Sequence, residues 1–402
     1  MNFSRDFVKI TFADFIVRSA YQTGKTPLLP IFAASLGASD AFLGIIVSVS
    51  TMTGLVLKPG IGILSDRWGR RLWLIIGTLF FVAMPFLYRF IETPQQLLVM
   101  RLIHGTATAI YGPVTLAYIA ELRPKNMAES LGWFGMARSG GYIAGPALAG
   151  WMLGWTSAVE IYTVIGLISA LAIVPVMTLK EIAPPRKERQ AGKSLPQQMI
   201  EAVAIGAQTP ALWLAGSLEM IAFIALYTLK AFLPLYVLAI GMGPFMAGLF
   251  FSVQETTTIL VKPFGGRLGD RVGHRVAITF GMALLGVGLL LVPRLSGIGL
   301  LFPAVITGLA QAFIFPSTVA LVSHEITREN LGAGMGFIGM MQNGGKVIGP
   351  VLGGFLIGAF SFETVLYLLA LLLLLVGAGM LPVVTHTIYT RVPQPLMAED
   401  SP

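Results

Sequence analysis

Apolar residues form long unbroken runs along this chain, and short polar segments separate the runs. Clear examples are residues 72–87, 161–179, 277–292 and 365–381. Each run approaches the roughly 20 residues that a helix needs to cross a bilayer. Because apolar and polar residues do not alternate within these runs, the pattern predicts membrane-spanning helices rather than the strands of a barrel.

The same pattern predicts twelve spans, and the composition agrees with it. The expected spans are 8–36, 41–64, 72–91, 95–120, 128–153, 158–180, 210–240, 245–266, 276–293, 297–323, 332–358 and 362–385. Of the 402 residues, 55% are hydrophobic and only 11% are charged, whereas about a quarter of the residues of a soluble domain are charged. We therefore expect an all-α membrane protein.

The distribution of basic residues gives the expected orientation. If both termini lie on one side, the loops of that side hold 17 of the 27 Lys and Arg, and the opposite loops hold only Arg89 and Arg294. Cytoplasmic loops carry such an excess, so the net charge of +8 does not indicate nucleic acid as a partner. We expect a multi-pass protein of the inner (plasma) membrane, with both termini cytoplasmic. The first span is too long for a signal-peptide core and is expected to remain as an anchor.

The chain divides into two similar halves. A segment rich in Pro and basic residues, 180–193, separates six spans from six, which predicts an N-terminal bundle over 1–180, a cytoplasmic linker over 181–209 and a C-terminal bundle with a short tail over 210–402. A shift of 204 residues aligns the halves and pairs, among others, Gly44 with Gly248, Ser48 with Ser252, Lys58 with Lys262, and Pro146 with Pro350. Two parallel halves of this kind can rock about a site between them.

A short loop after the second span carries glycines and charges in a distinctive order, Gly62-Ile-Leu-Ser-Asp66-Arg67-Trp-Gly69-Arg70-Arg71, and a similar loop follows the eighth span. Glycine permits a tight turn, and Asp66 suits a helix N-terminus. The loop resembles the signature cytoplasmic loop of the major facilitator superfamily. The resemblance implies twelve transmembrane helices in two pseudo-symmetric six-helix bundles, and it implies that these residues clasp the halves together: Gly62, Asp66, Arg67, Gly69, Arg71, Asp270 and Arg271. An ordinary basic loop is the alternative, which the second copy disfavours.

Two further motifs strengthen the resemblance. The fifth and eleventh spans contain Gly145-Pro146 and Gly349-Pro350 within runs of spaced glycines, similar to the drug/proton antiporter branch of the family. Small residues allow close helix packing and Pro bends a helix, so these positions are expected to act as a conformational gate, with simple tight packing as the alternative. The fourth span reads Arg101-Leu-Ile-His104-Gly105, similar to a family signature whose Arg is associated with proton coupling, although His104 replaces its Gln.

Five basic side chains are expected near the middle of the membrane, from a helical rise of about 1.5 Å per residue. An ionisable residue at that depth is costly and is a functional candidate by default. The expected substrate-binding residues are these five and two aromatic neighbours, namely Lys25, Arg101, Arg138, Lys230, Lys346, Tyr21 and Tyr227. Arg18, Lys58 and Lys262 are expected nearer the cytoplasmic boundary. The excess of cations favours an anionic or zwitterionic organic substrate, unless these charges pair structurally or reach towards the membrane surface.

Three side chains are candidates for carrying a proton. Glu255 is the carboxylate expected nearest the midplane, and its protonation would change with its surroundings. His104 titrates near neutral pH when unperturbed. Asp14 is the third, with the alternative that it pairs with Arg18 four residues later.

We therefore expect a secondary transporter that works by alternating access, with proton-coupled export of a small anionic, zwitterionic or amphiphilic compound. The alternatives are a multidrug/proton antiporter for cationic or neutral drugs and, in another class, a non-transporting receptor or scaffold. No enzyme activity, cofactor or metal is expected, since there is no Cys, the four His are scattered and no phosphate-binding Gly-rich loop occurs. The expected partners are a small-molecule substrate, protons and membrane lipids, and the expected state is a monomer.

Overall fold

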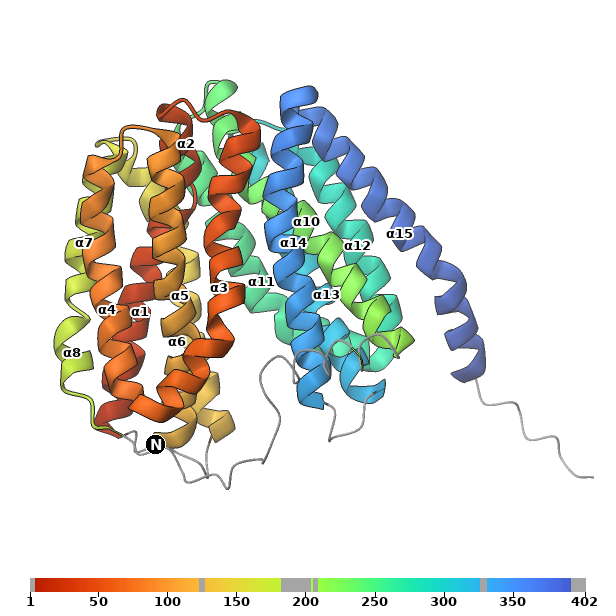
Figure 1. Cartoon of the computed structure of the whole chain (residues 1–402). Coiled ribbons are helices and arrows are strands. Elements are labelled where there is room, and N and C mark those ends of the chain that lie inside the picture. Colours follow the sequence, from red (N-terminus) through yellow and green to blue (C-terminus); the bar gives the residue numbers. More distant parts are fainter. Residues whose placement is uncertain (1–3, 123–126, 182–203, 205–208, 326–330, 392–402) are drawn as a thin grey trace, which may run out of the picture.

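A computed structural model of the chain describes residues 4–122, 127–181, 204, 209–325 and 331–391 (Figure 1). All of its regular structure in these residues is helical. The α-helices are α1 (Arg5–Lys25), α2 (Leu28–Ser35), α3 (Asp40–Trp68), α4 (Arg70–Leu87), α5 (Pro94–Leu122), α6 (Met127–Met152), α7 (Ala158–Ala170), α8 (Ile173–Met177), α10 (Pro210–Ala239), α11 (Pro244–Val272), α12 (His274–Leu291), α13 (Leu301–Glu325), α14 (Leu331–Ala359) and α15 (Phe362–Arg391). Short 3₁₀ turns lie at Tyr88–Phe90, Val292–Arg294 and Gly297–Leu300.

Within the described residues these helices form the twelve expected crossing segments, although two segments are broken. The first expected span is divided into α1 and α2 around Pro27, because Pro has no N–H to donate to the preceding turn. The sixth is divided into α7 and α8, with a turn at residues 171–172. Of the expected linker over 181–209, all but residues 181, 204 and 209 lie outside the described residues.

The two halves pack by the same plan. In the first half α1 packs against α6, and α3 packs against α5; in the second half α10 packs against α14, and α11 against α13. Across the halves, α3 packs against α14, and α6 packs against α11. Each of these contacts has its counterpart at the shift of 204 residues, so the sequence repeat corresponds to a repeat of the packing. Figure 1 shows the two halves side by side.

Hydropathy separates the helices into two groups. Seven described helical segments are long and apolar enough to cross a membrane, among them α10, α13 and the start of α3. The long helices that do not meet this criterion are α1, α5, α6, α11 and α14. These five carry most of the charges that the sequence places inside the membrane, and all five contribute to the cavity between the halves. Their low hydropathy therefore reflects a polar interior rather than exposure to water outside the bundle.

One end of the molecule, where α3 and α11 begin, is closed by backbone contacts between the halves; we call it the tight end. Gly44 lies directly against the carbonyl oxygen of Pro350, and Gly248 lies against the carbonyl oxygen of Pro146, so a Cβ atom at either glycine would overlap that oxygen. Hydrogen bonds support the contact, since Ser48 Oγ donates to the Val347 carbonyl over 2.8 Å. A small residue is needed at each glycine because two helix backbones meet there.

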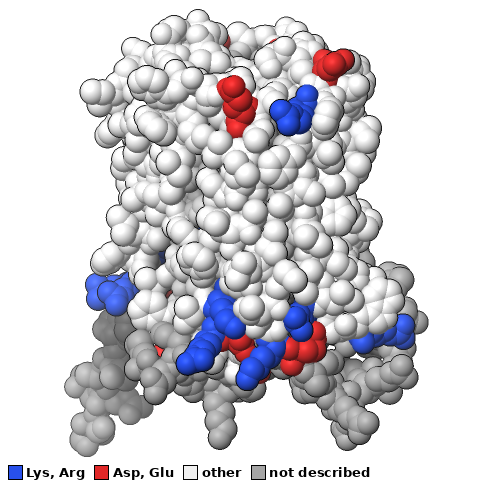
Figure 2. All heavy atoms as spheres, turned by 90° about the vertical axis from the view of Figure 1, so that its left-hand side faces the viewer, with Lys and Arg blue, Asp and Glu red and all other residues white. Residues whose placement is uncertain are grey.

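At the opposite end, where α3 and α11 finish, the same helix faces are parted; we call it the open end. On α3, Val56 is 71% exposed, and on α11, Leu260 is 66% exposed. A Cβ atom at Gly62 of α3 or at Gly336 of α14 would meet no atom within 4 Å. The chain thus lies in a conformation whose interior is closed at the tight end. Figure 2 shows that Lys and Arg side chains gather at the end where the N-terminus lies in Figure 1, which is the open end.

This asymmetry predicts a crosslinking pattern, which is easily tested because the natural chain has no Cys. We expect a cysteine pair at Ser48→Cys and Val347→Cys to be joined readily by a short bifunctional reagent, since Ser48 Oγ lies 2.8 Å from the Val347 oxygen. The matched pair Gly62→Cys and Gly336→Cys, on the same helices at the open end, is expected to remain unjoined. Equal joining of both pairs in the purified protein would contradict the described conformation.

Candidate functional site

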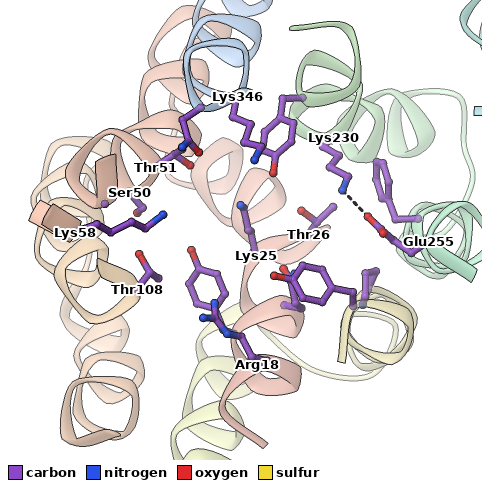
Figure 3. Close-up of a pocket in the computed structure, with 18 residues that line it drawn as sticks. Arg18, Lys25, Thr26, Ser50, Thr51, Lys58, Thr108, Lys230, Glu255 and Lys346 are labelled. Carbon is purple, nitrogen blue, oxygen red and sulfur yellow. Dashed lines mark hydrogen bonds and ion pairs between the residues drawn. The ribbon is translucent and has the colours of Figure 1, made fainter. Parts of the chain in front are cut away.

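A cavity of about 180 Å³ lies between the two halves, and we call it the central cavity. Helices α1, α3, α5 and α6 of the first half line it together with α10, α11 and α14 of the second. Its charged lining residues are Arg18, Lys25, Lys58, Lys230, Lys346 and Glu255. Among the described lining residues it therefore has five cations and a single carboxylate. Figure 3 shows that these side chains come from several elements and point toward a common space.

Three of these cations have no ion-pair partner among the described residues, namely Lys25, Lys58 and Lys346. Aromatic rings supply weak contacts instead. Lys25 Nζ lies 5.4 Å from the centre of the Tyr227 ring, and Lys346 Nζ lies 4.5 Å from the centre of the Phe223 ring. Such contacts stabilise a cation by only about 0.5–2 kcal/mol, which leaves most of the charge available to a ligand.

The carboxylate of the central cavity is engaged by the fourth lysine. Lys230 Nζ donates to Glu255 Oε1 over 2.8 Å, which joins α10 to α11 (Figure 3). The Tyr227 ring lies beside this pair, with its centre 5.6 Å from Lys230 Nζ. Both partners are mostly but not fully buried, at 22% and 17% side-chain exposure. The pair is therefore within reach of a molecule that enters the central cavity.

Arg138, an expected substrate-binding residue, is instead held by Asp14. Its Nε donates to Asp14 Oδ2 over 2.9 Å and its Nη2 donates to Asp14 Oδ1 over 2.8 Å. Arg18 Nε lies 3.6 Å from the same carboxylate, and Thr115 accepts a further bond from Arg138. Asp14 is fully buried and is absent from the lining of the central cavity. This geometry favours a structural role for Asp14 and Arg138, in which one carboxylate ties α1 to α6.

Arg101 and His104 line a second, smaller cavity inside the first half, and Tyr21 lines both cavities. Arg101 Nη1 donates to the Tyr88 hydroxyl over 3.5 Å, and His104 Nδ1 lies 3.3 Å from the same oxygen. Both side chains are buried, at 1% and 5% exposure. In this conformation neither of them reaches a molecule in the central cavity.

The loop around residues 62–71, which was expected to hold the two halves together, lies at the open end and makes its described hydrogen bonds within the first half. Glu181 Oε1 accepts from the backbone N–H of Arg70 over 2.8 Å and from that of Arg71 over 3.4 Å. Arg70 also forms an ion pair of 2.9 Å with Glu121. Arg67 is exposed, and the side chain of Asp66 lies outside the described residues. Gly69 has φ 89°, which favours glycine at the turn into α4.

The repeat of this loop is more exposed. Asp270 has 71% side-chain exposure and lies 3.7 Å from His274 Nε2, and Arg271 is exposed too. Gly273, the counterpart of Gly69, has φ 103°. The two loops therefore share their turn geometry, and no described interaction of either loop joins the halves.

Gly145 and Gly349, which were expected to belong to a conformational gate, allow close helix packing within each half. Gly145 lies against the backbone of α1 at Gln22 and Thr23, and Gly349 lies against the carbonyl of Ile224 in α10. The prolines that follow them, Pro146 and Pro350, present the carbonyl oxygens that meet the opposite half at the tight end. Each Gly-Pro pair thus contributes to packing inside its own half and to the contact between the halves.

The sequence did not assign several lining residues of the central cavity to the site. Lys58 and Arg18 were expected nearer the cytoplasmic boundary and were not named as substrate-binding residues, and Asn343 was not singled out. Lys58 lies four residues after Gly54 and seven after Thr51, so these positions share one face of α3. That spacing is the signal that could have identified it.

Comparison with known proteins agrees with this architecture. The sequence profile of the Major Facilitator Superfamily matches residues 11–256 and 217–400. An uncharacterised MFS-type transporter of Methanocaldococcus jannaschii is 24% identical, over 87% of this chain and 91% of that protein. Multidrug resistance protein 1 of Bacillus subtilis is 24% identical, over 82% and 84%, and the multi-drug resistance efflux pump PmrA of Streptococcus pneumoniae is 25% identical, over 85% and 86%.

Solved structures share the fold at lower identity. The nucleoside transporter NupG superposes with a TM-score of 0.81 at 16% identity, covering 95% of this chain and 99% of that chain. A bacterial homologue of the lysosomal transporter Spinster, in an inward-facing and unoccupied conformation, gives a TM-score of 0.75 at 14% identity, covering 96% and 97%. These likenesses confirm the predicted fold of twelve helices in two bundles.

The buried Asp14 cluster generates a stability prediction. Replacing Asp14→Asn leaves the guanidinium groups of Arg138 and Arg18 without a countercharge, and breaking a buried pair in this way costs about 3–5 kcal/mol. We expect a clearly lower melting temperature of the purified protein. The matched variant Lys58→Gln removes a charge that has no described partner, so it is expected to melt at or above the wild-type temperature. Equal melting of wild type and Asp14→Asn would contradict the structural role of this cluster.

Proposed function

The chain belongs to the major facilitator superfamily, and on that premise we propose that it is a secondary transporter for a small organic anion, working by alternating access with a proton as the coupling ion. The observation that carries the proposal is the charge of the central cavity. Five cations and one carboxylate line it among the described residues, and three of the cations lack ion-pair partners. An anion is the ligand that lowers the energy of such a site most.

The three unpaired lysines lie on different helices of both halves. Lys25 belongs to α1, Lys58 to α3 and Lys346 to α14. Figure 3 shows their side chains around one space, with Lys346 facing Lys25 and Lys58 from the other half. A carboxylate or phosphate bound among them would draw α14 towards α1 and α3. The anion would thus supply contacts that differ between conformations, which is what a ligand must do to shift a conformational equilibrium.

The geometry of the two ends supports alternating access. At the tight end the halves meet through backbone atoms, and at the open end the same helices are parted. Rocking of one half against the other would exchange these arrangements around the central cavity. Because basic residues gather at the open end (Figure 2), we infer that this end is cytoplasmic in the inner membrane. The described conformation would then face inward, with the N-terminus in the cytoplasm.

The Lys230–Glu255 pair is the proposed site of proton coupling. An anion that binds Lys230 deprives Glu255 of its cationic partner, and a carboxylate without a partner in a cavity of low dielectric is stabilised by taking up a proton. Conversely, a proton on Glu255 frees Lys230 for the anion. Anion and proton would therefore bind cooperatively, and both would be carried in the same direction.

A second candidate function is multidrug efflux in exchange for protons. It is supported by the similarity to the multidrug resistance protein of Bacillus subtilis and the multi-drug resistance efflux pump of Streptococcus pneumoniae, and by the repeated Gly-Pro pairs. From the sequence we expected export of the anionic or amphiphilic compound, whereas binding of the anion and the proton together favours uptake. Export would accompany this second candidate instead. For a cationic drug, the proton and the substrate would compete for Glu255 instead of binding together. Robust binding of cationic dyes, with no response to acidic compounds, would decide for multidrug efflux and against the anion.

One test uses the unpaired lysines. In a thermal-shift screen of purified protein against acidic, zwitterionic and cationic compounds, we expect stabilisation by acidic ligands. Lys346→Gln should weaken the best acidic ligand about tenfold or more, because a charge-assisted contact contributes about 1.5–3 kcal/mol. Arg89→Gln, which changes an exposed arginine at the tight end, is the matched control and should bind as the wild type does. An undiminished affinity of Lys346→Gln would exclude Lys346 as an anion ligand.

A second test concerns the proton. Binding of the acidic ligand is expected to tighten as the pH falls, because a proton on Glu255 frees Lys230. In Glu255→Gln this pH dependence should disappear while the ligand still binds, since the neutral amide mimics the protonated acid. Counterflow in proteoliposomes should persist in this variant, and accumulation driven by a pH gradient should be lost. Undiminished uphill accumulation by Glu255→Gln would show that the proton is carried elsewhere.

A further inference from the structure

The unpaired charge of the central cavity is larger than a ligand with one negative charge can balance. Lys25, Lys58 and Lys346 line the cavity without an ion-pair partner among the described residues. A monoanion would leave two of these ammonium groups unbalanced when the halves close over it, and an unbalanced buried charge is costly. The charge of the cavity therefore favours a ligand with at least two negative charges.

Lys58 lies in the part of the central cavity that is nearer the open end. A Cβ atom built on Gly54 would lie 4.0 Å from Lys58 Nζ and 3.6 Å from Thr108 Oγ1. The ammonium group of Lys58 therefore folds back over Gly54, in the direction in which helical side chains lean, and the missing side chain of this glycine leaves room for it. We call this place, between Lys58 and Thr108, the outer position.

Two other lysines lie around the ring of Tyr227, and we call this place the inner position. Lys25 Nζ lies 5.4 Å and Lys230 Nζ lies 5.6 Å from the centre of that ring. The two lysines belong to α1 and α10, one in each half. Figure 3 shows Lys58 and Lys230 on opposite sides of the central cavity, with Lys25 between them. An anionic group at the inner position would thus contact both halves.

The two positions also differ in depth. The inner position is level with the start of α3, because the next residue of α10, Thr228, contacts Gly353 of α14. Gly354 in turn lies against the carbonyl oxygen of Asp40. Gly54 follows Asp40 by 14 residues, which is roughly 20 Å along the helix. Side chains shorten this gap, but a single carboxylate or phosphate group is too small to contact both positions.

The space and the charge between the two positions suit a short chain. Lys346 precedes Val347, whose carbonyl accepts from Ser48, so Lys346 is level with a part of α3 that lies between the two positions. The central cavity of about 180 Å³ is several times larger than the roughly 30 Å³ of one water molecule. It therefore has room for more than a single ion.

We propose that the substrate is a small organic dianion with its two negative groups at opposite ends of a short chain. Lys25 and Lys230 hold one group at the inner position, Lys58 holds the other at the outer position, and Lys346 lies between them. This inference rests on the proposed transport of an organic anion and narrows its substrate class. The ligand would connect α1 and α3 of the first half with α10 and α14 of the second.

The test compares straight-chain dicarboxylates of increasing length with monocarboxylates of the same lengths, as ligands of the purified full-length protein in isothermal titration calorimetry near neutral pH. We expect the best dicarboxylate to bind about tenfold or more tightly than its matched monocarboxylate, because it makes one more charge-assisted contact. Inorganic phosphate, a compact anion, should bind more weakly than this dicarboxylate. Equal binding of dicarboxylates and monocarboxylates, or tighter binding of phosphate, would overturn the inference but leave transport of an anion standing. If no acidic compound binds, the proposed function fails as well.

Variants locate the outer group of the ligand. Lys58→Gln removes its partner, so the preference for the dicarboxylate over the monocarboxylate should fall from about tenfold to near unity. Gly54→Leu fills the place of the Lys58 ammonium group and should lower the preference in the same way. Arg89→Gln, which changes an exposed arginine at the tight end, is the matched control and should keep the full preference. If Lys58→Gln keeps it too, the second negative group is bound elsewhere and the proposal fails.

Discussion

A charged side chain that is withdrawn from water inside a membrane-spanning bundle is stable only beside a countercharge or a set of hydrogen-bond partners. This constraint organises the interior of the protein. Asp14 accepts two hydrogen bonds from Arg138 and so joins α1 to α6. Glu121 pairs with Arg70 near the open end, and Glu255 pairs with Lys230 between α10 and α11. Where the constraint is met from within the chain, the charges serve structure.

Where the constraint is not met from within the chain, the charges indicate function. Lys25, Lys58 and Lys346 lie around the central cavity with no ion-pair partner among the described residues. Their charge can be neutralised by a molecule that enters from the open end. The tight end, closed by the carbonyls of Pro146 and Pro350, would keep that molecule from leaving on the other side. The central cavity and the contact that closes the tight end thus share a helix, because α14 contributes Lys346 to the cavity and Pro350 to the contact.

The sequence predicted most of the fold because the bilayer imposes long apolar helices and because the repeat fixed how the halves correspond. Its errors were local. The first span is broken at Pro27, because hydropathy alone does not show whether a proline bends a span or divides it into two helices. The repeat made Gly44 and Gly248 equivalent positions, and in the structure both lie at the same kind of contact between the halves.

The candidate site was predicted only in part, since spacing along a helix shows which residues share a face but not which helix lies opposite. Lys25, Lys230, Lys346 and Glu255 do line one cavity. Arg138 lies 124 residues from the aspartate that holds it, so sequence alone could not separate it from the free lysines. The pairing of Asp14 with Arg18 was anticipated as an alternative, and the structure adds Arg138 as its closer partner.

The most direct test of the central claim is electrical, because the claim concerns the sign of the charge that the central cavity takes up. Proteoliposomes adsorbed on a solid-supported membrane would be exposed in turn to acidic, zwitterionic and cationic compounds, and the binding current would be recorded. Because a proton bound together with the anion would cancel its charge, the currents are recorded with Glu255→Gln, which binds the anion without a proton on residue 255. The account predicts that acidic compounds then give saturable currents corresponding to displacement of negative charge into the protein, and that adding Lys346→Gln reduces them. Saturable currents from cations alone, with no response to any acidic compound, would contradict it.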